Sequence, residues 1–286
     1  MVSQIVTHPG SAHKDDFLAV CLLIAKYRVP VSRRAPTSAE LLDPSVCVVD
    51  VGDEHCAERM NFDHHQLPRD HVPTCSISLV LRHLGLDEDA RLLCGWLECA
   101  EWLDVRGPQK TAEWLGVATA VLDRLSSPVD LSLLRRFGRC SELSPGEPLY
   151  EVMRYVGEDL IDYLTTARGR IDLIGERATL WRLEARGEVF EALFVPRTEP
   201  LPADPSGDTE QYVRVAGLSE RVAAIVYPDS RSTGFGIARF DDHPKLDFCR
   251  VAAEPDVRFA HKSGFLCKTS ATAPERLQAL LCAAWG

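Results

Sequence analysis

The first part of the chain alternates between strand-like and helix-like patterns of hydrophobic residues. Gln4 to Thr7 is a short β-prone segment, and a helix pattern beginning at His13 or Lys14 extends to about Lys26 after a Pro-Gly turn. The nearly continuous β-branched run from Val46 to Val51 predicts a strand covered on both faces, as in a parallel sheet. Helix patterns follow at 76–84, 90–103 and 111–125. This alternation predicts an α/β fold built on a parallel sheet.

The pattern changes after a long amphipathic helix that we predict from Pro148 to Arg168. Strand patterns then occupy 179–185, 189–195, 222–229 and 234–240, and a last helix begins at Pro274. The proline-rich stretch from Pro196 to Gly207 is predicted to be a surface excursion. Because single hydrophobic cores stop growing near ~250 residues, a chain of 286 residues predicts two domains. We place them at 1–172, including a helical connector, and at 173–286.

Composition and charge narrow the class of protein. With 45% hydrophobic and 26% charged residues, the chain has the composition of a soluble globular protein. Its most apolar run is far shorter than the ~20 residues of a membrane-spanning helix, and the first residues lack a basic signal-peptide region. We therefore predict a cytoplasmic protein with no membrane partner. Ten scattered cysteines without a CxxC pair give no sign of a zinc knuckle or redox dithiol.

A net charge of −10 argues against broad, non-specific binding to a nucleic-acid backbone. Any phosphate-bearing substrate must therefore meet local positive charge. Two basic stretches, Arg28 to Arg34 and Arg135 to Arg139, are candidates for guiding RNA. Ordinary solvated surface is the more usual interpretation of such charge runs.

Histidines and carboxylates gather near the N-terminus, where seven of the nine histidines lie within the first 83 residues. Four groups stand out: His8, His13 and Asp15 between the first strand and helix; Asp50 at the end of the buried strand; Asp63, His64 and His65; and Asp104 at the end of an apolar helix. Loops at the carboxyl ends of parallel strands line the crevice where α/β proteins bind ligands. A buried lone carboxylate such as Asp50 costs several kcal/mol, which a metal ion would offset.

Mixed imidazole and carboxylate ligands suit Mn²⁺, Fe²⁺, Co²⁺ or Zn²⁺, and several carboxylates together favour Mn²⁺. Asp63 is placed to orient a ligating histidine through its second ring nitrogen. Asp16 is interpreted as an acid of the helix N-terminus rather than a ligand.

The order of these groups resembles the four-motif pattern of the DHH phosphoesterase superfamily, and more narrowly the MYG (melanocyte proliferating gene) family. The similar segments are THPGSAHKDD at 7–16, VVDVGDEHCAERMNFDHHQ at 48–66, CSISLVLRHLG at 75–85, VYPD at 226–229 and FAHKSGFLC at 259–267. The chain departs from the family where Val105-Arg106-Gly107 replaces the usual Asn and Gly after the helix-terminal Asp, and where Pro9 follows His8. These changes leave the proposed ligands in place but reshape the loops.

The resemblance implies a DHH catalytic domain, a helical connector and a smaller α/β substrate-binding domain. It implies that two divalent ions are held by six side chains: His8, His13, Asp15, Asp50, His64 and Asp104. Asp50 would bridge the ions, and Asp50, Asp63 and His65 would form the catalytic group, with His65 facing substrate phosphate. In the C-terminal domain, His261, Lys262, Ser263 and Gly264 would present donors to a phosphate or nucleotide. The same run is also compatible with a plain loop before a strand.

Three functions remain open at this point. The resemblance favours a Mn²⁺-dependent phosphodiesterase, a 3′-to-5′ exoribonuclease or oligoribonuclease acting on RNA or short oligonucleotides. A small-molecule phosphatase or pyrophosphatase suits the acidic net charge better. A nucleotide-binding module without turnover is the third, although the complete ligand set argues against it. A homo-oligomer is compatible with each of them.

Overall fold

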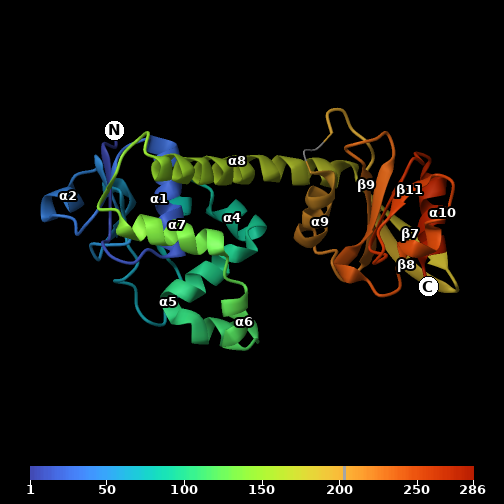
Figure 1. Cartoon of the computed structure of the whole chain (residues 1–286), viewed down its shortest axis with the longest axis horizontal. Helices are drawn as coiled ribbons and strands as arrows, with labels where there is room; N and C mark the ends of the chain where they lie inside the picture. Colours follow the sequence, from blue (N-terminus) through green and yellow to red (C-terminus); the bar gives the residue numbers. More distant parts are fainter. Residues whose placement is uncertain (202–203) are drawn as a thin grey trace. The chain divides into compact units, whose positions relative to one another are not determined.

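The computed structural model describes residues 1–201 and 204–286, and within them the chain forms two compact units, Met1–Thr165 and Thr166–Gly286 (Figure 1). Each described unit holds a six-stranded sheet, and each is treated by itself below. A mixed α/β fold was predicted and is confirmed. The assignment of 1–172 and 173–286 as catalytic and substrate-binding domains remains a prediction.

The first unit is built on a sheet whose central strands are parallel. The strand order is β4-β5-β3-β1-β2-β6, with β4 and β6 antiparallel at the two edges. The strands are β1 (Gln4–Thr7), β2 (Val31–Arg33), β3 (Val46–Val49), β4 (His55–Cys56), β5 (Asn61–Phe62) and β6 (Glu142–Leu143). The chain passes from β1 to β2 on one side and returns to β3 on the other. This reversal creates the crevice beyond the carboxyl ends of β1 and β3 where such sheets bind ligands.

Helices complete the first unit: α1 (Lys14–Tyr27), α2 (Ser38–Leu42), α3 (Ser76–His83), α4 (Asp87–Leu93), α5 (Gly95–Leu115), α6 (Thr119–Arg124), α7 (Pro128–Arg139) and the first part of α8 (Pro148–Arg177). Helix α1 is buried in its middle, including the whole run 19–24, as its apolar sequence predicts. Helix α8 approaches it closely at Gly157, where an added Cβ would lie 2.0 Å from the Cys21 carbonyl oxygen. Only glycine permits this packing.

The predicted helices 90–103 and 111–125 have different bounds in the structure, and the second is divided between α5 and α6. The predicted helix 90–103 is interrupted at Cys94, between α4 and α5. Helix α5 then continues past Asp104 to a break at Gly107, whose φ of 76° is non-helical, and resumes at Pro108. Proline is favoured in a first helical turn and glycine tolerates positive φ, so this pair makes the kink.

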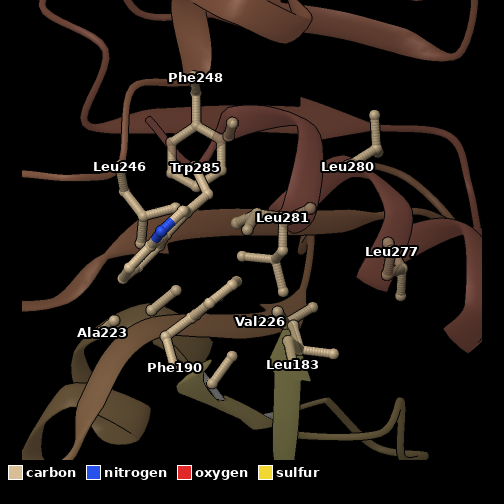
Figure 2. Close-up of a cluster of buried hydrophobic side chains, with 14 of the residues drawn as sticks. Leu183, Phe190, Ala223, Val226, Leu246, Phe248, Leu277, Leu280, Leu281 and Trp285 are labelled. Carbon is tan, nitrogen blue, oxygen red and sulfur yellow. The ribbon is translucent and has the colours of Figure 1, made fainter. Parts of the chain in front are cut away.

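The second unit has the strand order β11-β12-β10-β9-β8-β7, in which the β8–β9 pair is parallel and the others are antiparallel. The strands are β7 (Thr179–Ala185), β8 (Glu188–Phe194), β9 (Val222–Pro228), β10 (Phe235–Arg239), β11 (Val257–Ala260) and β12 (Leu266–Thr269), with helices α9 (Pro205–Val215) and α10 (Pro274–Ala284). Figure 2 shows the core beneath α10, where Leu277, Leu281 and Trp285 meet Phe190 and Phe248. The rings of Phe190 and Trp285 stack with centroids 4.0 Å apart.

The prediction of a surface excursion at 196–207 was wrong in its last residues, because Pro205 begins α9. The Asp204 side chain caps this helix by accepting a hydrogen bond from the Gly207 N–H at 3.0 Å. Aspartate followed by proline is a helix-start signal as well as a turn signal. Pro202 and Ala203, also in this stretch, lie outside the described residues.

Candidate metal centre

The carboxyl edge of the first sheet brings the predicted ligands together from separate segments. His8 follows β1, Asp50 follows β3, and His64 follows β5, three neighbouring parallel strands. His13 precedes α1 and Asp15 lies in its first turn, whereas Asp104 comes from α5. Five of the six predicted ligands line a pocket of about 560 Å³: His8, His13, Asp50, His64 and Asp104.

The donor atoms fall into three overlapping groups in which every atom lies within 4.8 Å of the others. The groups are His8, His13 and Asp50; His13, Asp15 and Asp104; and Asp50, Asp63, His64 and His65. His13 and Asp50 each belong to two groups, so the donors form one continuous cluster. Donor atoms at these separations have the spacing that a cation needs to gather them into its coordination shell.

The backbone at Asp50 adopts an uncommon conformation. Its φ is 57°, a left-handed value that aspartate tolerates better than most residues. The Asp50 N–H still bonds to the Phe62 carbonyl at 3.1 Å, so β3 ends here against β5. One Asp50 oxygen lies 3.0 Å from His64 Nε2 and the other 3.4 Å from His8 Nε2. The turn of the chain therefore directs this carboxylate toward two histidines.

His64 lies between two carboxylates and is almost fully buried. Its Nε2 is 3.0 Å from Asp50 and 3.1 Å from Asp104. Burial lowers the pKa of His64, but its contacts with Asp104 and Asp50 outweigh burial and raise the pKa to about 10. Burial raises the pKa of Asp104, but contact with His64 outweighs it and brings that pKa below the ordinary value. His64 therefore links Asp50 and Asp104 within the cluster.

Asp15 is the carboxyl group of this cluster with the clearest missing partner. Its side chain is 1% exposed, and one oxygen accepts a hydrogen bond from the Ser76 hydroxyl at 2.8 Å. The other oxygen, Oδ1, has no hydrogen-bond partner among the described residues. Burial and the charges of Asp50, Asp104 and Asp16 raise the pKa of Asp15 well above its ordinary value. A buried carboxylate oxygen without a donor fits a position that a cation would fill.

His8 places a buried ring nitrogen beside two carboxylates, Asp16 and Asp50. Its Nε2 is buried and makes no hydrogen bond to the described residues, although Asp16 Oδ2 lies 3.0 Å away. The contact with Asp16 raises the pKa of His8. Burial lowers this pKa, but the charges of Asp16 and Asp50 raise it further, so that it lies above the ordinary value. Asp16 itself accepts a hydrogen bond from the His13 N–H at 2.7 Å, the helix-start role predicted for it. Asp16 therefore also orders the two histidines on either side of the loop.

Asp63 acts on a different histidine from the one the sequence pattern suggested. Its Oδ1 accepts from His65 Nδ1 at 2.7 Å, whereas only the backbone N–H of His64 reaches it. Burial raises the pKa of Asp63, but the hydrogen bonds from His65 and Asp53 outweigh it and bring that pKa below the ordinary value. Asp63 is therefore the orienting partner of His65, which lines the pocket and is half exposed.

Sequence reasoning missed the groups that support and border this cluster. The Arg33 guanidinium, 1% exposed, lies 3.4 Å from Asp16 and donates to the Gly10 carbonyl at 2.9 Å. The interpretation of 28–34 as a basic surface was wrong for Arg33. At the pocket rim, Arg106 donates to the carbonyls of Arg69 and His71. The only feature of the sequence that singled out Arg106 was the departure from the family pattern directly after Asp104.

The predicted C-terminal run lies in the second unit, in the turn between β11 and β12. Gly264 has a φ of 69°, and an added Cβ would lie 2.1 Å from Asp247 Oδ1. The Gly264 N–H bonds to the His261 carbonyl at 2.8 Å, while Lys262 and Ser263 are exposed. A tight turn that needs glycine is therefore present, and the substrate-binding role of this run remains a prediction.

Comparison with known families adds one finding. The model named MYG1_exonuc, described as Uncharacterised protein family (UPF0160), matches residues 4–87. The matched segment contains His8, His13, Asp15, Asp50 and His64, and Asp104 lies beyond it. No curated protein matches the chain. Separately, among residues 1–201 and 204–286 no helix has the length and apolar character to cross a membrane.

Proposed function

The chain belongs to the MYG family through residues 4–87, and from this premise we propose that it is a metal-dependent phosphodiesterase acting on RNA ends or short oligonucleotides. One observation carries the proposal: six imidazole and carboxylate side chains from distant segments meet at the carboxyl edge of a parallel sheet. The word "exonuc" in the family model's name supports the nuclease class. We propose a 3′-to-5′ direction and a cytoplasmic location from the family resemblance alone.

His8, His13, Asp15, Asp50, His64 and Asp104 would hold two divalent ions, with Mn²⁺ favoured by the mixed nitrogen and oxygen donors. When bound, such ions supply an activated water and neutralise charge on phosphoryl oxygens. Asp50, shared between two donor groups, is the proposed bridging ligand. The unpartnered Asp15 Oδ1 supports a cation at this position.

Side chains of the pocket wall would hold the substrate. Asp63 fixes His65 through Nδ1, which leaves Nε2 available to a phosphate oxygen. Arg69 and Arg106 on the same wall supply positive charge to an acidic chain. In the second unit, His261, Lys262, Ser263 and Gly264 would contact phosphate or nucleotide, as the resemblance implies.

The test measures stepwise shortening of a 5′-labelled oligoribonucleotide in the presence of Mn²⁺. We expect Asp50→Asn to lower the rate by about 10³-fold, because several kcal/mol of transition-state stabilisation depend on the metal cluster. Asp123→Asn, an exposed carboxylate on α6, is the matched control and should keep full activity. An RNA left intact after long incubation with Mn²⁺ or Co²⁺ would rule out the proposal.

A small-molecule phosphatase is the second candidate, because the net charge of −10 disfavours long polyanions. Release of inorganic phosphate instead of nucleotide monophosphate from the same substrates would identify it. A binding module without turnover predicts fewer than two ions per chain, which metal analysis of the purified protein measures.

A further inference from the structure

One face of α7 carries three arginines beside a second concavity in the first unit. Arg135, Arg136 and Arg139 are exposed and line a hollow of about 690 Å³, together with residues of the segment 143–149. Positions 135 and 139 are one helical turn apart, about 6 Å along the helix axis. We call this hollow the α7 groove. None of its lining residues belongs to the candidate metal centre.

The three guanidinium groups have no ion-pair partner among the described residues, although the chain has ten more acidic than basic residues. Across 1–201 and 204–286, the ion pairs include no partner for Arg135, Arg136 or Arg139. The groove's carboxylate, Glu147, instead accepts a hydrogen bond from the Ser144 N–H at 3.0 Å. Three adjacent like charges repel one another, and a bound polyanion would relieve that repulsion.

Helix α7 is attached directly to the loop that carries His8 and His13. An added Cβ at Gly138 would lie 3.2 Å from the Gly10 oxygen and 3.3 Å from the Ala12 nitrogen. The buried Arg33 guanidinium donates to the carbonyls of both Gly10 and Phe137 and lies 4.4 Å from the centre of the Phe137 ring. A ligand held by α7 is therefore held at a fixed position relative to the metal-ligand loop.

We propose that the α7 groove binds the phosphodiester backbone of single-stranded RNA, as a second contact outside the metal-ligand pocket. This inference takes its ligand from the proposed function. Guanidinium forks match phosphate oxygens, and neighbouring arginines on one helix face take neighbouring phosphates. The groove lining includes no aromatic side chain among the described residues, so base stacking is absent and binding depends little on sequence.

Other polyanions fit this surface less well. An anionic membrane presents a flat face, whereas the arginines border a hollow. An acidic peptide would have to match three charges within one helical turn, while a nucleic-acid strand repeats its charge at every residue. Each alternative is an arm of the experiment below.

The experiment measures binding by fluorescence anisotropy in the presence of a chelator, so that hydrolysis does not interfere. Full-length wild-type protein, R135Q/R136Q/R139Q and R135K/R136K/R139K are titrated against a labelled 12-nucleotide RNA at several salt concentrations. The control variant K26Q/K110Q/R124Q removes three exposed charges from α1, α5 and α6. Equal thermal unfolding midpoints check that each variant is folded.

We expect the glutamine variant to reduce the salt dependence, the slope of log K against log salt, by about 2, because each lost phosphate contact contributes about 0.7. The lysine variant should recover most of the affinity, and the control should bind like wild type. Equal affinity and slope in wild type and the glutamine variant would overturn the inference. The inference would also be overturned if the glutamine variant lost binding to phosphatidylserine vesicles or to a poly-glutamate peptide but kept its binding to RNA. Since no turnover is measured, the proposed hydrolysis can fail while this result stands.

Discussion

Buried carboxylates in the second unit and in the candidate metal centre of the first unit are stabilised in opposite ways. In the second unit, the buried carboxylates of Asp208 and Asp229 each contact a cation, Arg170 at 3.1 Å and Lys268 at 2.7 Å. In the first unit, Asp15, Asp50 and Asp104 face one another and histidines. A buried carboxylate with a structural role is paired with a Lys or Arg side chain of the protein. A group of buried carboxylates without such a side chain indicates a binding site for a cation from solution.

Arg33 sharpens this comparison, because it is a permanent cation at the border of the first cluster. Its guanidinium and Asp16 are 1% and 0% exposed, so breaking the pair leaves a charge buried. We expect Arg33→Met to lower the free energy of unfolding by about 3–5 kcal/mol, the largest effect predicted here. Urea unfolding followed by circular dichroism measures it.

Arg34→Met is the control for this change, since Arg34 pairs with Glu40 at the surface and should matter far less. A similar, small loss in both variants would mean that Arg33 is not needed to balance Asp16.

Lys268 tests the other side of the comparison. Burial raises the pKa of Asp229, but contacts with Lys268 and Ser232 outweigh it and keep the pKa below the ordinary value. Because Lys268 is 31% exposed, water screens part of the interaction, and Lys268→Met should cost about 1–2 kcal/mol. The loss should shrink as the pH falls through the lowered pKa of Asp229, since a protonated carboxyl needs no cation.

Thermal unfolding over a pH series measures the effect, with Lys245→Met as control because its pair with Glu188 is exposed. A loss that does not depend on pH would show that Lys268 stabilises by packing alone.

Asp15 supplies the most diagnostic change, because its substitution should have opposite effects without and with Mn²⁺. In chelator, Asp15→Asn should raise the free energy of unfolding by about 1 kcal/mol, because it removes a buried charge beside like charges and keeps an acceptor for Ser76. The same variant should lose most of the stabilisation that excess Mn²⁺ gives wild type, about 2.7 kcal/mol at 100 times the dissociation constant.

Differential scanning fluorimetry with and without Mn²⁺ measures both values, with Asp123→Asn as control. If Asp15→Asn responds to Mn²⁺ like wild type, Asp15 is not a ligand.

Sequence patterns predicted the elements whose burial is uniform. Strand β3 and helix α1 were predicted within two residues because each contains a long uninterrupted apolar run. The positions of Asp50 and His64 followed from the rule that parallel strands end at a common edge. Contacts between segments did not follow: the burial of Arg33 depends on Phe137, more than a hundred residues away. The pairing of Asp63 with His65 depends on a local side-chain geometry that spacing does not encode.

The left-handed backbone at Asp50 limits which residues can replace it during evolution. Glycine has no penalty there and asparagine a small one, whereas β-branched residues would be strained whatever the chemistry of the pocket. A descendant that has lost catalysis is therefore expected to carry Asn or Gly at this position more often than Val, Ile or Thr. The fold leaves a narrow set of substitutions open at the residue on which the proposed reaction depends.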